Sequence, residues 1–394
     1  MDTTLTEEEV MVRETARRFL EAECPTKLVR AMEKDELGYP PALWKQAAEL
    51  GWQGMCLPEA YGGSELPLVY LGLVMEEAGR ALAPLPLLST SMAALTIADV
   101  GSDAVKAAVL PGVAAGDTVL SWAFSEQDPR FRLDSVQATA KADGDSYVIN
   151  GTKLFVENFS CSDQCLVAVR TAPASASSAG LSLLLVDTKS AGIAASPLIT
   201  LAKDKMSAVT FTNVRVPAAN LVGALNGAGP AIEKMLERGT ALLCAQMLGA
   251  TRKDSEMAVE WAKYRKAFGQ PIGAFQSIQH MCADALMWID GGNLLTYEAL
   301  WRMDQGLPAT VESSQAKAFC NEKCEAVVRI CQGIHGGIGF MMEFDLQLWY
   351  RRVCAWTMRL GTAYEHRAKV AHALIDLPGE VVLGRPVPVE ADAA

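Results

Sequence analysis

The distribution of apolar and polar positions along the chain changes twice, and the first pattern is helical. Thr6 and Glu9 have the spacing of a helix-capping box, and apolar residues then recur on one helix face. Helical periodicity continues to about residue 117, with a turn-forming cluster at 57–63. We therefore expect residues 1–117 to form a helical domain.

A β-rich pattern follows. Asn150 and Gly151 form a turn signal between two runs of β-favouring residues, which predicts a hairpin centred on this pair. Three further runs have the composition of strands: 165–170, 181–186 and 209–216. We expect residues 118–227 to form a small β domain.

The helical period returns at residue 228. The expected helices here are long and their connections short: 231–267, 277–303, 311–332 and 346–375. Such helices predict an antiparallel four-helix bundle over residues 228–378. The chain is thus expected to be an α+β, mostly α protein, with residues 379–394 as a flexible tail rich in Pro, Val and Gly.

Composition narrows the class of protein. Hydrophobic residues make up 50% of the chain, enough for a large core. A net charge of −11 without a long basic run argues against nucleic acid as the main partner. The first residues do not resemble a targeting peptide, and the apolar stretch 82–98 is short and interrupted by prolines. We expect a soluble, cytoplasmic protein without a membrane span.

The ten cysteines and four histidines give little support for disulfides or a metal site. The sequence contains no C-x-x-C pair and no H-E-x-x-H motif. Cys320, Cys324 and Cys331 recur at helical spacing, so we expect them to be thiols on one buried helix face.

Two short segments carry candidate chemistry. Arg265 precedes Gly269 and Pro271 at an expected helix end, where it could hold a pyrophosphate, although an arginine ahead of a turn is more often solvated. The glycines of residues 332–340 would let the backbone approach a phosphate or a ring. This loop follows a helix, so it is not a dinucleotide-binding fingerprint. Taken alone, His335 is more typical of a structural histidine than of a catalytic one.

In their order along the chain, several segments resemble the acyl-CoA dehydrogenase family: 58–63, 150–153, 214–217, 220–223, 265–276 and 332–340. The resemblance covers nearly the whole chain. It implies the three-domain fold described above, FAD as cofactor, an acyl-CoA substrate and an electron-transfer flavoprotein as acceptor. It also implies an oligomer, either a homo-oligomer or a heterotetramer with a second chain of the same family.

The resemblance assigns residues to the flavin. Arg265 and Phe268 would hold its diphosphate and adenine side. Gln276 would complete that site, while Gln332 and Gly336 would reach the flavin of a neighbouring subunit. The residues expected along the isoalloxazine ring are Trp122, Phe124, Ser125, Phe155 and Val156, and Thr362 is also expected to bind the cofactor.

The chain departs from the family at the catalytic base. The family's usual base is a glutamate directly before a Gly-Thr pair, but here Leu360 precedes Gly361 and Thr362. Some members carry the base on an earlier helix, at the position matching Gly239. Neither residue can accept a proton, so the base is unknown. Glu237 lies two residues from Gly239, a rotation of about 200° on a helix, and is therefore a poor substitute.

The flavin side also departs. The family's Thr-Glu-Pro turn is Ser-Glu-Gln at 125–127, and its Trp-Ile-Thr is Phe-Val-Glu at 155–157. A carboxylate at Glu157 beside a flavin must be paired or turned to solvent.

Residues 335–345, with Arg351 and Arg352, resemble a bacterial subgroup that often lacks the usual base and is often assembled from paired chains. Several of its members act on CoA thioesters of bulky substrates such as steroid side chains. Three interpretations stay open. The chain is a dehydrogenase subunit, active through an unconventional base or completed by a partner. It is a non-catalytic subunit that shapes a partner's site. Or it is a flavin enzyme with different chemistry.

Overall fold

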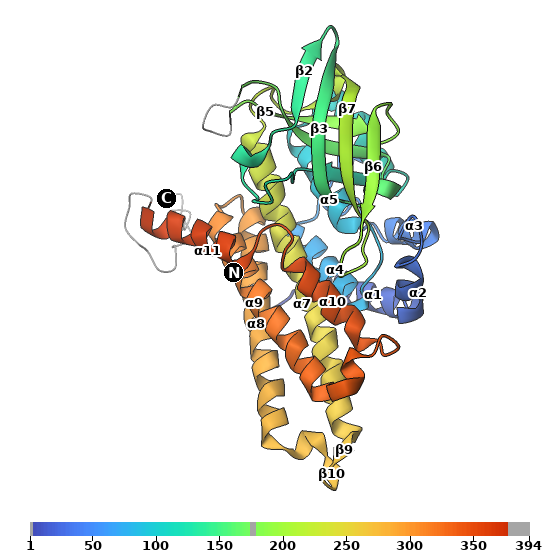
Figure 1. Ribbon diagram of the computed structural model, residues 1–394, viewed down its shortest axis with the longest axis vertical. Coiled ribbons are helices and arrows are strands. Elements are labelled where there is room, and N and C mark those ends of the chain that lie inside the picture. The colour runs from blue at the N-terminus through green and yellow to red at the C-terminus, as the bar shows by residue number, and fades with distance from the viewer. Residues whose placement is uncertain (1–2, 174–178, 377–394) are drawn as a thin grey trace.

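The computed structural model describes residues 3–173 and 179–376, and Figure 1 shows three structural units. The β domain lies at the top of the view, the N-terminal helices lie beside the upper half of the bundle, and the bundle extends downward. The predicted architecture of a helical, a β and a second helical domain is confirmed. The tail predicted at 379–394 lies outside the described residues.

The N-terminal domain contains the helices α1 (Glu7–Glu23), α2 (Thr26–Met32), α3 (Pro41–Glu49), α4 (Leu68–Ala81), α5 (Leu87–Val100) and α6 (Asp103–Ala114). The predicted capping box starts α1: Glu9 N donates to Thr6 Oγ1 (3.2 Å) and Thr6 N donates to Glu9 Oε2 (2.7 Å). Arg17 then ties α1 to α4 by donating to both carboxylate oxygens of buried Glu77, at 3.0 and 2.6 Å. Helix α4 packs on α7, so this pair connects the N-terminal domain to the bundle.

The β domain has eight strands among the described residues: β1 (Leu120–Ala123), β2 (Thr139–Asp143), β3 (Ser146–Glu157), β4 (Gln164–Arg170), β5 (Leu181–Asp187), β6 (Ile193–Leu198), β7 (Met206–Pro217) and β8 (Leu221–Val222). The sheet order is β6-β7-β3-β2-β4-β5-β8, with β1 parallel to β4. Alternating apolar residues of β3, β4, β5 and β7 form its core.

The hairpin predicted at Asn150 and Gly151 is wrong, because both residues lie inside β3. The turn comes earlier, where Asp143 pairs with Ser146. The register of β3 against β7 shifts next to Gly151, so the Asn-Gly signal marks a bulge. A Cβ on Gly151 would lie 2.6 Å from the Ala138 side chain, which explains why glycine is needed there.

The bundle consists of α7 (Gly229–Tyr264), α8 (Gln276–Asp304), α9 (Thr310–His335), α10 (Leu346–Trp356) and α11 (Ala363–Ala371). Helix α7 has 36 residues and is therefore about 54 Å long. The continuous helix expected at 346–375 is wrong. The chain leaves the helix after Trp356, because Leu360 and Gly361 adopt left-handed backbone angles (φ 55° and 105°).

The bundle core contains the predicted thiol face. Cys320, Cys324 and Cys331 on α9 are buried free thiols. Within the described residues, no group of three His, Cys, Asp or Glu side chains is placed to hold a metal ion. No helix in the described part of the chain is long and apolar enough to cross a membrane.

Asp254 on α7 is a fully buried acid with no ion-pair partner among the described residues. Neither carboxylate oxygen has a hydrogen bond of normal geometry to a described residue. Burial raises the pKa of Asp254 well above its ordinary value, and the neighbouring Cys331 thiol opposes that shift only in part. The folded protein therefore keeps this proton at pH values where the unfolded chain, with a pKa of about 3.9, has lost it. Folding takes up a proton, so this residue lowers stability progressively as the pH rises above about 4.

We expect Asp254→Asn, which cannot ionise, to remove this loss. The stability gain over wild type should increase by up to about 1.4 kcal/mol per pH unit above pH 4, until the pKa of the folded state is reached. Urea unfolding at pH 5 and pH 8 measures it. The control is Asp284→Asn, an exposed acid on α8, which should shift neither curve. If the difference in unfolding free energy between Asp254→Asn and wild type is the same at pH 5 and pH 8, the prediction is wrong.

Candidate active site

The first group of expected flavin residues lies at the end of β1. Trp122 is on β1, and its Nε1 is buried without a hydrogen-bond partner among the described residues. Phe124 is buried and stacks on Phe131, with ring centroids 6.1 Å apart. Ser125 follows and is also buried; its carbonyl accepts a hydrogen bond from Leu154 N (2.8 Å). The structure thus joins the end of β1 to β3.

A buried ion pair fixes the turn after Ser125. Lys153 Nζ on β3 donates to Glu126 Oε1 (2.7 Å) and to the Phe124 carbonyl (3.0 Å). The Glu126 carboxylate also accepts from the backbone N–H groups of Gln137 and Ala138. Burial lowers the pKa of Lys153, and Glu126 opposes that shift. Both charged groups are buried, so removing either one would leave the other without an opposite charge.

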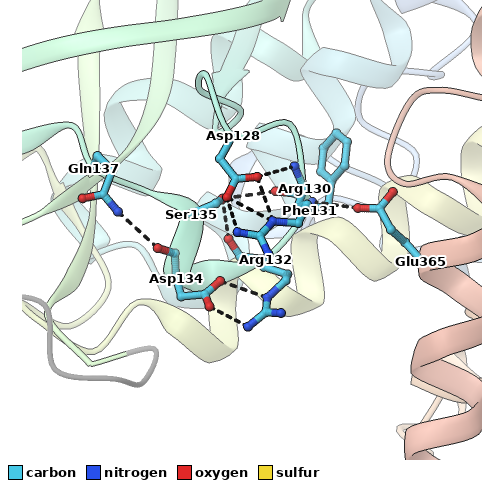
Figure 2. Close-up of polar contacts among 8 residues, drawn as sticks. All are labelled: Asp128, Arg130, Phe131, Arg132, Asp134, Ser135, Gln137 and Glu365. Atoms are coloured by element: carbon cyan, nitrogen blue, oxygen red, sulfur yellow. Dashed lines mark hydrogen bonds and ion pairs between the residues drawn. The ribbon is translucent and has the colours of Figure 1, made fainter.

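The loop at 128–135 is braced by its own charges (Figure 2). Arg130 pairs with Asp128 and Arg132 with Asp134, and the Ser135 hydroxyl donates to the carbonyls of both arginines. Hydrogen bonding to Arg130 lowers the pKa of Asp128 to about 2. The loop contacts α11 through Phe131 N, which donates to Glu365 Oε1 (3.4 Å).

Phe155 and Val156 end β3 in an irregular conformation. Phe155 has a left-handed backbone (φ 54°) at a register shift, and its side chain is 56% exposed while Val156 is buried. Positive φ is unfavourable for a bulky residue, so the surroundings must hold it. The consequence is an aromatic ring presented at the surface beside the end of β1.

Glu157 is paired, as its position requires. Arg359 Nη1 lies 2.8 Å from Glu157 Oε1, and its Nη2 forms a second ion pair with Asp204 in the β6–β7 loop. Burial lowers the pKa of Arg359, and Glu157 opposes that shift. Sequence reasoning missed Arg359, although it directly precedes Leu360. The ion pairs connect the base position to the end of β3.

Leu360 and Gly239 do not face the same space. Leu360 lines a cavity of about 630 Å³ between α7, α9, α11 and the loop at 131–134, together with Thr240 and Glu237. A Cβ on Gly239 would instead lie 2.3 Å from Met92 Cε on α5. The expectation that Glu237 and Gly239 point to different faces is therefore correct, but Glu237 faces the cavity that Leu360 lines. Burial raises the pKa of Glu237, opposed by a hydrogen bond from Thr310 (2.5 Å).

The second group of expected flavin residues lies at the end of the bundle where α7 ends and α8 begins, away from the β domain. Arg265 follows α7, and Phe268 lies in the turn between β9 (Lys266–Ala267) and β10 (Gln270–Pro271). Phe268 is 95% exposed, with φ 52°, and Gln276 begins α8 nearby. All three side chains are open to solvent.

The glycine loop lies at the same end. Gln332 is buried, and its Oε1 lacks a partner among the described residues. Gly336 has φ 66° and open space where a Cβ would be. His335 stacks on Trp261 at 5.1 Å, and its Nδ1 is 2.8 Å from the Cys331 carbonyl, in accordance with a structural histidine. Burial lowers the pKa of His335.

The two groups lie at opposite ends of the molecule (Figure 1). Thr362, which caps α11, belongs with the β-domain group, because its capping partner Glu365 also contacts Phe131. Arg265 is separated from the β domain by the length of α7, about 54 Å. One chain therefore does not bring all of the expected residues to a single cofactor.

The chain belongs to the acyl-CoA dehydrogenase family. Models of the acyl-CoA dehydrogenase N-terminal, middle and C-terminal domains match residues 6–117, 121–214 and 227–375. A probable acyl-CoA dehydrogenase of Bacillus subtilis, YngJ, is 31% identical over 95% of this chain and 100% of its own length. Acyl-CoA dehydrogenases are FAD-dependent, and FAD is the cofactor of this chain.

Two other relatives indicate the variety in the family. The caffeyl-CoA reductase-Etf complex subunit CarC of Acetobacterium woodii is 28% identical over 94% of this chain and 98% of its own. The solved structure of a variant of the steroid ACAD Tcur3481-Tcur3483 is 28% identical, with a TM-score of 0.85, and covers 95% of this chain and 99% of that one.

The buried polar atoms fit a bound cofactor. Trp122 Nε1 is a donor and Gln332 Oε1 an acceptor, and each lacks a partner among the described residues. Gly336 leaves room for close approach of a bulky group. The two atoms belong to the two separate groups of residues expected at the flavin.

Arg265→Ala should weaken FAD binding while leaving assembly and stability near wild type. The exposed arginine would lose a charge-assisted contact to phosphate, roughly 1.5–3 kcal/mol, or about tenfold to 150-fold in Kd. Titration of the apoprotein with FAD measures it. Lys266→Ala, the adjacent exposed cation, is the matched control. An unchanged Kd in a correctly assembled Arg265→Ala protein would remove Arg265 from the site.

Proposed function

We propose that this chain is a subunit of an FAD-dependent acyl-CoA dehydrogenase in which each flavin is held between two chains. Trp122, Phe124, Ser125, Phe155, Val156 and Thr362 would contact it from one chain. Arg265, Phe268, Gln276, Gln332 and Gly336 would contact it from the other. The main support for this proposal is that the length of α7 separates these two groups of residues within one chain. A cofactor that contacts both groups therefore needs two chains.

The proposed reaction is α,β-dehydrogenation of a CoA thioester. A base removes a proton from the carbon beside the thioester carbonyl, the β-carbon loses a hydride, and a C=C bond forms. FAD, when bound, accepts the hydride. The 630 Å³ cavity lined by Leu360 is the candidate space for the acyl-CoA. Arg132 and Lys369 line it, but Arg132 is paired with Asp134, and Glu233 and Glu237 also line the cavity, so its charge is balanced rather than positive.

The position of the base supports a heteromeric enzyme. Leu360 is buried and apolar, so this chain supplies no carboxylate at the usual position. We propose that a second, related chain provides the base, that the substrate is bulky, such as a steroid side chain, and that an electron-transfer flavoprotein accepts the electrons. The double name of the steroid ACAD Tcur3481-Tcur3483 and the Etf complex of CarC support these choices.

A non-catalytic role within such a complex is the second candidate. Phe131 stacks on Phe124 beside the expected flavin position, and Glu157 with Arg359 replaces a neutral residue with an ion pair. Both features alter the β-domain half of the site. In the bundle-end half, the side chains of Arg265, Phe268 and Gln276 are exposed to solvent. This asymmetry favours a chain that contributes to a partner's flavin more than to its own.

We expect the FAD-loaded protein to be at least dimeric, because the two halves of the site belong to different chains. Light scattering gives the mass, and the ratio of flavin to protein absorbance gives the FAD content. A monomer that retains one tightly bound FAD per chain would contradict the shared site.

The isolated chain should show little acyl-CoA dehydrogenation, because general-base catalysis contributes about 10²–10⁴-fold. Leu360→Glu should raise turnover of linear, branched or steroid thioesters in a dye-reduction assay. Leu360→Gln, which has the same shape but is no base, is the control. Robust turnover by the wild type alone would disprove the need for a partner's base. Glu237→Gln is then the first variant to test, because Glu237 shares the cavity with Leu360.

A further inference from the structure

A lysine is buried in the middle of the bundle without a counter-ion. Lys317 on α9 is fully buried, and no described carboxylate lies within ion-pair distance of it. Its ammonium donates to Asn321 Oδ1 (2.7 Å), to the Trp356 carbonyl (2.8 Å) and to Met247 Sδ (3.6 Å). Burial lowers the pKa of Lys317 to about 8. A cation kept at such a desolvation cost needs a specific reason.

The first reason lies at the end of α10. Trp356 is the last residue of this helix, where backbone carbonyls lose their i+4 partners and carry partial negative charge; its own carbonyl accepts one turn-type bond from Arg359 N (3.2 Å). Lys317 satisfies the Trp356 carbonyl with a full positive charge, which is the favourable sign at a helix C-terminus. The lysine therefore supplies a second, charged donor to the carbonyl at which the segment after α10 begins.

The second reason is Asn321, one turn further along α9. Its Oδ1 accepts from Lys317, which leaves Nδ2 to donate to the Gly361 carbonyl (3.2 Å). Lys317 thus orients the amide that holds the far end of the same segment. Both ends of residues 356–361 are fastened to one face of α9.

The segment between these two contacts is strained. Leu360 adopts φ 55°, which is unfavourable for a leucine and persists only where the surroundings impose it. His366 Nε2 adds a third contact, at 2.8 Å from the Leu360 carbonyl. Leu360 is the position of the usual base, and Thr362 directly follows the segment.

We propose that Lys317 and Asn321 are positioning residues that hold 356–361 in the conformation presenting Leu360 and Thr362 to the flavin and substrate. They act through the backbone of this segment. The second part of the proposal rests on the proposed function, whereas the first part, that the pair holds the segment, is independent of it.

The test uses the assembled, FAD-loaded protein with Lys317→Met, Asn321→Ala and the double variant. Lys323→Met is the matched control, because Lys323 is on the same helix but lies over the Trp288 ring. Hydrogen exchange of a peptide covering 357–365 should become about tenfold faster or more in both single variants, while α8 peptides stay unchanged. The double variant should be no faster than the singles, because the two residues form one network.

The flavin gives the functional readout. Visible circular dichroism of bound FAD should change in both single variants, and FAD affinity should fall about tenfold. Unchanged exchange at 357–365 overturns the holding role. Faster exchange with an unchanged flavin spectrum and affinity overturns the positioning role. A wild-type chain that binds no FAD counts instead against the proposed function. If Lys317→Met does not fold, Asn321→Ala decides, because it removes the amide and keeps the lysine.

Discussion

The length of α7 is the constraint on which the rest of the structure depends. Its backbone hydrogen bonds fix a rise of about 1.5 Å per residue, so 36 residues separate its two ends by about 54 Å. Helices α4, α8 and α9 pack along it, and no side-chain rotation can bring Arg265 to Ser125. A cofactor contacted by both residues, as we propose, would therefore be shared between two chains, and assembly would complete the site.

Helices with a repeating apolar pattern can be predicted from the sequence, whereas turns and helix breaks that depend on contacts with distant segments cannot. Long 3.6-residue periods predict α7, α8 and α9 correctly, because one buried stripe is enough to define a helix. The Asn-Gly signal misplaced a turn, since whether Gly151 turns or bulges depends on Ala138 in another strand. The expected helix at 346–375 failed because its break at Leu360 is imposed by α9 and α11, which no local pattern records.

The candidate site was predictable in its parts and not in their arrangement. Family-like segments name the residues expected at the flavin, but only the fold divides these residues between two ends of the chain. The helical rotation between residues 237 and 239 correctly places Glu237 and Gly239 on different faces of α7. It could not show that Leu360 lines the same cavity as Glu237. That relation involves α7 and the segment after α10, which are about 120 residues apart in sequence. The Arg359–Glu157 pair has the same origin, since its partners come from different domains.

Two unpaired polar atoms connect cofactor binding to stability. Trp122 Nε1 is a donor and Gln332 Oε1 an acceptor, but Trp122 is on β1 in the β domain and Gln332 is near the end of α9 in the bundle, and neither has a partner among the described residues. Each buried atom without a partner costs about 1–3 kcal/mol. A ligand that satisfies both in an assembled protein recovers part of this cost only in the folded, associated state. In the proposed shared site, FAD would stabilise assembly as well as fold, by an amount that increases with the logarithm of its free concentration over Kd. Under the proposed function, the same buried atoms that destabilise the isolated chain would therefore make cofactor binding and association cooperative.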